Sequence, residues 1–156
     1  MKSRKQFGLA FIAVATIGAG TVAFISTTAG ADAFHGFHIH ANNDPANGEG
    51  CLAEGKFVSA DGHFKQAGQI HGQHTGDLPS VYVNGDGSFE ATYTLDKVNR
   101  EELTGKAVIM HAGADNFGNV PVGAEPDKYT ANSQAATDLT NATGNAGARV
   151  ACGVIG

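Results

Sequence analysis

The clearest hydrophobic pattern in the chain is a short alternation of polar and apolar residues over 33–41. Successive side chains on a β-strand point to opposite faces, so the pattern predicts a strand that buries Phe37 and Ile39. The same geometry places His38 and His40 together on the other face. Two imidazoles on one side of a strand can bind a metal as a pair, although an isolated His-x-His is more often simply a polar strand face.

Further elements are predicted from turn residues that separate apolar or β-branched runs. Residues 42–50 consist of turn formers and lead to Cys51. Residues 81–83 and 88–95 flank an Asn-Gly-Asp-Gly turn and predict a β-hairpin. Residues 96–105 predict one helical turn that ends at their final glycine.

Two long segments, 52–79 and 112–147, have little apolar periodicity and predict ordered loops. An apolar run at 107–110 leads into His111, and residues 149–155 predict the last strand. Strands separated by turns and by two long loops predict an all-β sandwich or barrel. Long loops inside a compact domain are usually functional, so we expect the chemistry of the chain there.

The composition indicates one globular domain that is rich in turns. The chain has 156 residues, of which 42% are hydrophobic and 22 are glycine, so a second domain does not fit. The net charge is -5 and there is no run of Lys and Arg. Nucleic acid is therefore not an expected partner, because binding to phosphates needs clustered basic residues.

The N-terminus has the pattern of a secretory signal. Three basic residues among the first five precede an apolar run at 7–25, and small residues offer cleavage sites near Ala31 or Ala33. We therefore expect a signal peptide at 1–33 and a secreted, periplasmic or extracellular domain at 34–156. No stable membrane association is expected after cleavage; the alternative is that the run is retained as a membrane anchor.

Cys51 and Cys152 are the two cysteines of the sequence. In an exported chain two cysteines predict one disulfide, because export delivers the chain to an oxidising compartment. Such a bond would close a loop of about 100 residues and stabilise the fold by about 4–5 kcal/mol in the chain-entropy model.

Candidate metal ligands fall into two groups. Three imidazoles and one carboxylate are an ordinary closed zinc set. The first long loop carries such a set, namely His63, His71, His74 and Asp77. The alternative is that this segment is simply a solvated loop. The histidine pair at 38 and 40 with His111 forms a second group of three nitrogen ligands, which leaves a position open for an exogenous ligand, as catalytic sites do.

Five stretches of the chain, taken together, resemble one protein family. They are residues 36–40, 62–64, 74–79, 111–116 and 144–155, and the last of them is highly specific. In this order they resemble the copper/zinc superoxide dismutase family, and its secreted bacterial branch most of all. The resemblance begins at residue 34 and continues to the end of the chain.

The resemblance implies two metals with a ligand set for each. The implied copper ligands are His38, His40, His63 and His111. The implied zinc ligands are His63, which would bridge the two metals, His71, His74 and Asp77. His71 and His74 are separated by only two residues, a much shorter spacing than is usual in the family.

The resemblance also implies roles for other residues and an activity. Asp115 would hydrogen bond to ligand histidines of both metals, and Cys51 and Cys152 would form the family disulfide. The activity would be superoxide dismutase, which converts superoxide to dioxygen and hydrogen peroxide by redox cycling of copper. Arg149 would attract the anion beside the open copper position, and His63 would release and recapture a proton. The alternative is a catalytically inactive, exported copper-binding module derived from the same fold.

The expected fold is the Greek-key β-sandwich or flattened barrel of this family, with two long functional loops. We expect it to be incomplete at its N-terminus, because family members have a hairpin and a further strand ahead of the His-x-His strand. Here the predicted signal runs almost directly into Phe34. Either the apolar segment 7–27 is retained and fills the gap, or a second copy in a homodimer or another partner chain completes the sheet, or the sequence is truncated.

Overall fold

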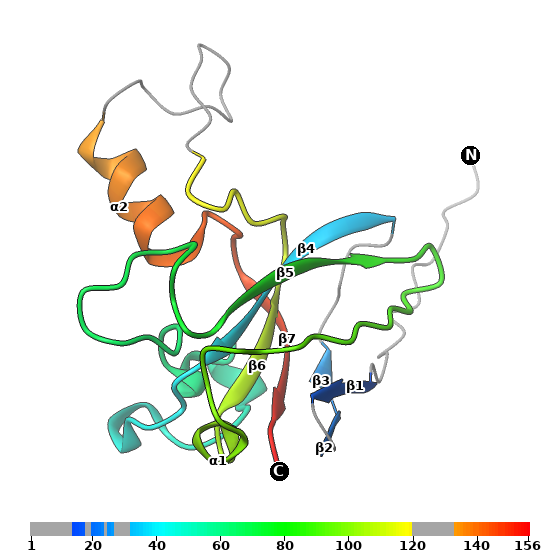
Figure 1. Ribbon diagram of the computed structural model, residues 1–156. Helices are drawn as coiled ribbons and strands as arrows, with labels where there is room; N and C mark the ends of the chain where they lie inside the picture. The colour runs from blue at the N-terminus through cyan, green and yellow to red at the C-terminus, as the bar shows by residue number, and fades with distance from the viewer. Residues whose placement is uncertain (1–13, 18–19, 24, 27–31, 120–132) are drawn as a thin grey trace, which may run out of the picture.

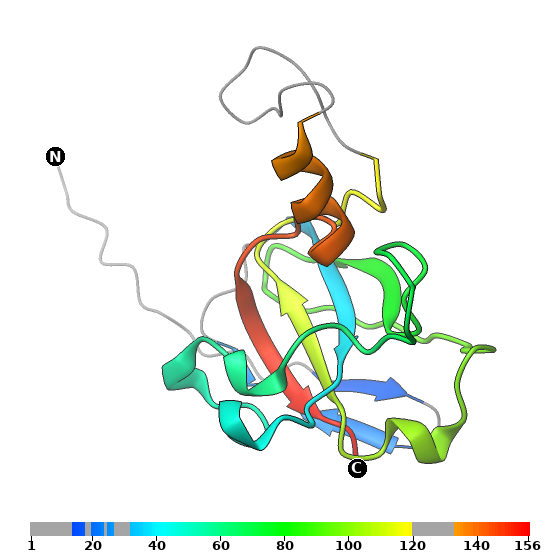
Figure 2. The ribbon, with the colours of Figure 1, turned by 90° about the vertical axis from the view of Figure 1, so that its left-hand side faces the viewer.

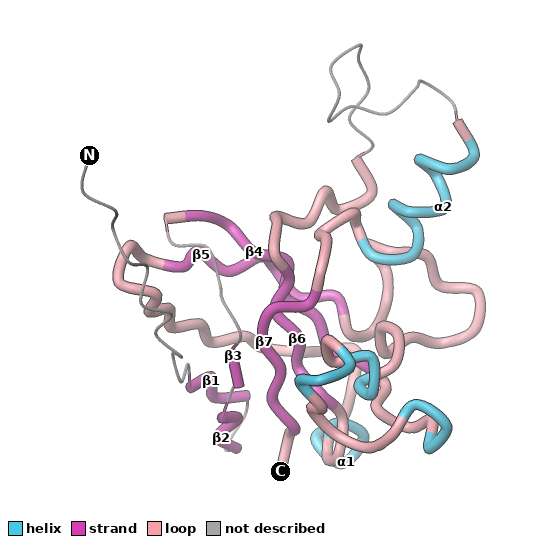
Figure 3. Tube along the Cα trace, turned by 180° about the vertical axis from the view of Figure 1, so that it is seen from behind, coloured by secondary structure: helices cyan, strands magenta, loops and turns pink. Residues whose placement is uncertain are grey.

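The computed structural model describes residues 14–17, 20–23, 25–26, 32–119 and 133–156, and it is predominantly β. The main sheet is antiparallel, and Figures 1 and 3 show its strands side by side. In spatial order its strands are β3 (Ile25–Ser26), β7 (Arg149–Val154), β6 (Ala107–His111), β4 (Ala33–His40) and β5 (Asp77–Val83). A second, two-stranded sheet pairs β1 (Val14–Ile17) with β2 (Gly20–Ala23).

The main sheet is covered on both faces at its centre, where β4 and β6 pair. All five residues of β6 are buried. The main core lies on one face and contains Phe37 and Ile39 of β4, as the alternation predicts. On the other face Ile109 packs in a second apolar cluster with Phe57 and Ala60. His38 and His40 therefore project from β4 on the face opposite the main core.

The predicted disulfide between Cys51 and Cys152 is confirmed. The two Cα atoms lie 5.5 Å apart, and the bond joins positions 101 residues apart in the sequence. Cys152 belongs to β7 and to the second apolar cluster, and Cys51 packs against that cluster. The bond thus fastens the loop that follows β4 to the strand that carries Arg149.

Short helices connect the strands. Three 3-10 turns follow β4: η1 (Pro45–Asn47), η2 (Ala53–Gly55) and η3 (Val58–Ala60). The helical turn predicted within 96–105 is confirmed as α1 (Arg100–Leu103), which begins with a reciprocal capping box between Asn99 and Glu102. Figure 2 shows α2 (Gln134–Thr143) beyond one end of the sheet, with α1 at the opposite end.

The prediction of a hairpin with a second strand at 88–95 is wrong. The turn forms, with the Asn84 amide donating to the Ser88 carbonyl at 2.8 Å, and alternate residues from Phe89 to Leu95 pack against the main core. No strand is assigned to 88–95, however. Pro79 of β5 has no N–H to donate, and its carbonyl accepts from the Tyr93 hydroxyl at 3.0 Å, so backbone pairing is disfavoured there.

The two long loops are also more structured than predicted. β5 already begins at Asp77, inside the segment expected to be a loop. The helix α2 lies within the second expected loop. Hydrophobic periodicity gives no sign of it, because only Ala136 and Thr140 of the helix are buried. Its caps are the available signal: the Ser133 side chain accepts from the Ala136 amide, and Gly144 ends the helix in the left-handed conformation.

Part of the predicted signal segment is in strands. β3 pairs with β7, with Ile25 opposite Cys152 and Ser26 opposite Ala151. One expected way of completing the sheet is retention of the apolar segment 7–27. The structure shows backbone pairing for that segment, between β3 and β7. Cleavage near residues 31–33 stays a prediction. In the described part of the chain, no helix has the length and apolar character that a bilayer crossing needs.

Candidate metal centre

Three segments bring four buried histidines together. His38 and His40 come from β4, and His111 is the last residue of the neighbouring β6. The loop carrying His63 lies beside β4, because the Phe64 amide donates to the Ile39 carbonyl at 2.8 Å. Each of the four histidines is at most 6% exposed. The expected copper set is therefore assembled: one ligand atom from each lies within 4.8 Å of the others.

The ring nitrogens that face one another in this copper set make no hydrogen bonds with the described residues. Within the described residues, four buried nitrogens of the set have no hydrogen-bond partner: His38 Nδ1, His40 Nε2, His63 Nε2 and His111 Nε2. A buried polar atom without a partner is costly, and native proteins rarely tolerate several together. Four such nitrogens in one place fit a metal ion that binds imidazole, such as copper.

Hydrogen bonds on the far side of three rings determine which nitrogen is available. His40 Nδ1 lies 2.7 Å from the Asp61 carbonyl, and His111 Nδ1 lies 2.9 Å from the Gly147 carbonyl. Because a carbonyl can only accept, both Nδ1 atoms carry the proton and both Nε2 atoms keep the lone pair. His38 Nε2, 2.6 Å from Asp115 Oδ2, leaves Nδ1 as the lone pair in the same way. The fold thus selects the tautomers that metal binding needs.

Burial keeps these rings neutral. Burial lowers the pKa of His63 to about 4 and that of His111 to about 3, and it lowers the pKa of His40 well below its ordinary value. Neighbouring histidines add to the effect in each case. At neutral pH the three imidazoles are therefore unprotonated, which is the form that binds a metal.

The expected zinc set converges on one carboxylate oxygen. Asp77 Oδ1 lies 3.0 Å from His63 Nδ1, 3.3 Å from His71 Nδ1 and 3.2 Å from His74 Nδ1. His74 Nδ1 is also 3.3 Å from His63 Nδ1. Tetrahedral zinc with bonds of 2.0–2.1 Å holds its ligand atoms about 3.3 Å apart. The set therefore has the donor types of a zinc site, with Asp77 Oδ1 at about ligand spacing from each of the three imidazoles. His63 presents a different nitrogen to each set.

A second grouping of the same atoms contains His38 in place of His74. The ligand atoms of His38, His63, His71 and Asp77 all lie within 4.8 Å of one another. His38 is already engaged on both nitrogens, with Nε2 held by Asp115 and Nδ1 in the copper set. His74 Nδ1 has no such competing use and lies 3.2 Å from Asp77 Oδ1, so His74 stays the expected member of the zinc set.

Asp115 joins the two sets. Its Oδ2 lies 2.6 Å from His38 Nε2 and 2.8 Å from His71 Nε2, and its Oδ1 accepts from the Phe117 amide at 2.6 Å. Burial alone would raise its pKa, but the hydrogen bonds from His38 and His71 hold the pKa of this carboxyl well below its usual range. The carboxylate is thus ionised at neutral pH and orients one ring of each set.

His71 faces a carboxylate on each ring nitrogen. Although burial lowers its pKa, the carboxylates of Asp115 and Asp77, to which the protonated ring can donate, raise the pKa of His71 to about 9. A proton therefore occupies Nδ1 in the metal-free chain at neutral pH, and zinc must displace it.

This proton predicts a strong pH dependence of zinc binding. Between pH 6.5 and 8.5 the zinc affinity should rise about tenfold per pH unit, because one proton is released for each ion bound. Copper affinity should change less steeply, since three of the four rings in its set are already neutral. Competition with a chromogenic chelator, corrected for the chelator's own titration, measures both. A flat zinc profile would contradict the assigned proton on His71.

Arg149 lies opposite His111 across β6 and β7, next to a register shift that follows Met110. Its guanidinium donates from Nη1 to the Phe57 carbonyl and from Nη2 to the Asp61 carbonyl. Arg149 and His63 line one open pocket of about 410 Å³. The structure thus places Arg149 beside His63 of the copper set, on the same pocket.

His35 lies outside both sets. It is fully buried, and its Nδ1 donates to the backbone carbonyl of His111 at 2.6 Å. Sequence reasoning missed two residues that shape the site, Asp61 and Gly144. Neither belongs to a ligand pattern, and only their contacts show what they do.

Comparison with known proteins agrees with this geometry. The model of the copper/zinc superoxide dismutase family matches residues 12–155. This chain belongs to that family. Its four-imidazole set is a copper-type site, and its cluster of imidazoles around Asp77 is similar to the zinc-type site of such a protein. The matched region includes the strands β1 to β3.

Two curated relatives come from mycobacteria. The Cu-Zn superoxide dismutase of Mycolicibacterium paratuberculosis is 43% identical over 133 residues, which cover 79% of this chain and 56% of the relative. That of Mycobacterium bovis is 41% identical over 159 residues, covering 96% of this chain and 60% of the relative. The chain thus spans little more than half the length of these relatives.

A solved structure shows a related fold. The Cu/Zn superoxide dismutase from Brucella abortus superimposes with a TM-score of 0.54 at 25% identity, and the match covers 88% of each chain. The chain is therefore predominantly β with a fold like that of a known superoxide dismutase.

Proposed function

We propose that this protein is a secreted copper/zinc superoxide dismutase that converts two superoxide ions and two protons to dioxygen and hydrogen peroxide. The observation that carries the proposal is the copper set, whose four buried nitrogens have no hydrogen-bond partner among the described residues. Bound copper would supply the one-electron exchange with superoxide. The Greek-key sandwich, which the sequence predicts to be incomplete at its N-terminus, is part of the same proposal.

The chain's own residues contribute substrate guidance and proton handling. Arg149 presents a cation to the pocket next to His63, where a small anion can enter. His63 can hold or release a proton at Nε2, the nitrogen that faces the copper set, while Nδ1 stays with the zinc set. The rings of His38 and His71 are held by Asp115, so neither reorients when a metal is exchanged.

Secretion is proposed from two features of the chain. The basic and apolar pattern of residues 1–33 is that of a secretory signal. The disulfide between Cys51 and Cys152 fits an oxidising compartment. Superoxide is the proposed substrate, and a homodimer or a completing partner chain is the proposed assembly.

The test is the salt dependence of superoxide decay by pulse radiolysis on protein loaded with copper and zinc. The wild-type rate should fall as ionic strength rises, because salt screens the attraction of the anion to Arg149. Arg149→Ala should lower the rate, and Arg149→Glu should lower it about 10-fold or more and flatten or reverse the salt slope.

Arg100→Glu is the matched control. It makes the same change in net charge on the exposed α1, and it should leave the wild-type salt slope in place. Equal, salt-insensitive rates in all variants would reject Arg149 as the anion guide. No protein-dependent decay in the loaded wild type would defeat the enzyme and leave the alternative, an inactive copper-binding module.

A further inference from the structure

Asp61 has a backbone conformation that residues other than glycine rarely adopt. Its φ is 63° and its ψ is -158°, directly after η3. This region is populated almost entirely by glycine, because a Cβ crowds the neighbouring peptide groups. A residue stays in it only where surrounding contacts hold it there.

The Asp61 carboxylate supplies those contacts. Oδ2 accepts from the amides of Asn43 and Asp44 at 2.6 and 2.8 Å, and Oδ1 accepts from the Asn47 side-chain amide at 2.8 Å. All three donors belong to the segment that follows β4. Although burial acts in the opposite direction, the hydrogen bond from Asn47 leads the contacts that lower the pKa of this carboxyl.

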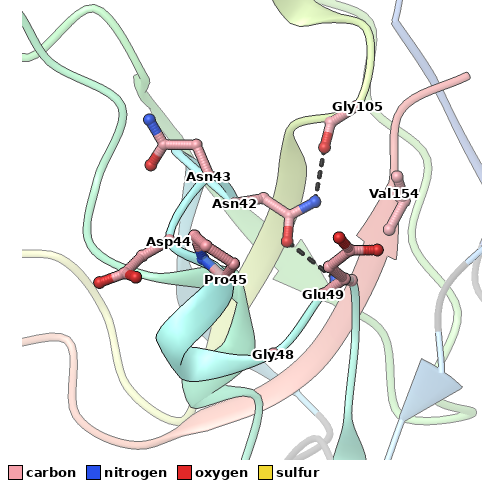
Figure 4. Close-up of a pocket in the computed structure, with 9 residues that line it drawn as sticks. Asn42, Asn43, Asp44, Pro45, Gly48, Glu49, Gly105 and Val154 are labelled. Carbon is pink, nitrogen blue, oxygen red and sulfur yellow. Dashed lines mark hydrogen bonds between the residues drawn. The ribbon is translucent and has the colours of Figure 1, made fainter.

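The segment that Asp61 holds is itself fixed at its other side. The Asn42 side chain donates to the Gly105 carbonyl and accepts from the Gly50 amide at 3.0 Å (Figure 4). The segment 42–50 is therefore held by hydrogen bonds on two sides. The carboxylate of Asp61 accepts hydrogen bonds from this fixed segment.

The carbonyl of the same residue faces the copper set. It accepts from His40 Nδ1 at 2.7 Å and from Arg149 Nη2. One peptide oxygen thus directs the lone pair of His40 Nε2 into the copper set and directs the guanidinium of Arg149 to the pocket.

We propose that Asp61 is a positioning residue whose carboxylate clamps its own strained peptide, so that the carbonyl orients both His40 and Arg149. The consequence for superoxide rests on the proposed function. The orientation of His40 does not, because it can be measured in the metal-free protein.

Three substitutions separate the clamp from the strain. Asp61→Asn removes the charge but keeps one acceptor oxygen for the Asn43 and Asp44 amides, while the oxygen that accepts from Asn47 becomes a donor. Asp61→Ala removes the clamp but keeps the Cβ. Asp61→Gly removes both the clamp and the strain.

Two readouts in the metal-free protein follow the clamp directly. The first is amide hydrogen exchange at Asn43 and Asp44, and the second is the nuclear magnetic resonance signal of the His40 Nδ1 proton. In Asp61→Ala the two amides should exchange at least about 10-fold faster and the His40 proton signal should be lost. Asp61→Asn should match wild type in both. Asp61→Gly should show fast exchange but keep the His40 signal, because glycine holds the carbonyl in place without strain.

Asp86→Ala is the control for loss of an aspartate cap. The Asp86 carboxylate also accepts a backbone amide, that of Ser88 at 2.9 Å, but on the turn after β5. It should leave both readouts unchanged.

A wild-type His40 signal with wild-type exchange in Asp61→Ala would overturn the proposal. If that variant fails to fold, unchanged exchange in Asp61→Gly overturns it instead. In the copper-loaded protein, Asp61→Ala should also alter the nitrogen hyperfine pattern of the electron paramagnetic resonance spectrum. Loaded wild type without superoxide decay would defeat the proposed function, whereas these readouts would still test Asp61.

Discussion

Replacing His63 with alanine should remove both metals from the protein. His63 Nε2 faces the copper set, and His63 Nδ1 lies 3.0 Å from Asp77 Oδ1 and 3.3 Å from His74 Nδ1. Loss of an outer hydrogen-bond partner already costs 10–100-fold in metal affinity, so loss of a direct ligand should weaken each metal by more than about 100-fold. Metal analysis after dialysis against a chelator measures this, and superoxide decay should fall to the protein-free rate.

Two single-site controls make the result diagnostic. His40→Ala should lose copper and keep zinc, because His40 lies in the copper set alone. His74→Ala should lose zinc and keep copper, because His74 is not one of the four histidines of the copper set and its Nδ1 approaches Asp77. A His63→Ala protein that loses copper but retains zinc at wild-type affinity would place His63 in the copper set only.

Replacing Gly144 with alanine should weaken zinc binding and destabilise the fold, although Gly144 is not a ligand. Gly144 ends α2 with φ at 60°, and a Cβ built there would collide with Asp115 Oδ1 and His71 Nε2. The carboxylate must move, so it loses its hold on the rings of both sets. We expect about 2–4 kcal/mol of destabilisation from overpacking and backbone strain, and about 10–100-fold lower zinc affinity.

Two other glycines isolate the cause. Gly55→Ala adds a methyl group where nothing lies within 4 Å and φ is not positive, so it should change little. Gly105→Ala adds the same group in open space at φ 82°, so it should show the strain without the collision. Thermal unfolding and zinc competition measure all three. If Gly144→Ala and Gly105→Ala bound zinc with equal affinity, the collision with Asp115 would have no effect on zinc binding, and the prediction would be wrong.

The sequence predicts most of the ligand chemistry. His38 and His40 share a face because strands alternate with a period of two, and this rule is local. The two cysteines permit a single intramolecular pairing, so the disulfide needed no structure to be proposed. The helical turn before Gly105 is likewise local, because its capping box lies within four residues.

Predictions failed where pairing or packing decides the structure. The apolar pattern of 88–95 is that of a strand, yet Pro79 in the facing strand lacks an N–H, and the Tyr93 hydroxyl donates to its carbonyl. The helix α2 buries too few residues to produce a hydrophobic period, and its place depends on contacts with distant segments, such as the His71 amide donating to the Asn141 carbonyl.

The sequence by itself therefore determined which residues can bind metal and on which strand face they lie. Only the tertiary structure decided which nitrogen of each ring is free to do so. His40 is set by the carbonyl of Asp61, 21 residues away, and His38 by the carboxylate of Asp115, 77 residues away. A tautomer depends on whether its partner donates or accepts, and no local pattern in the chain encodes a partner at such distance.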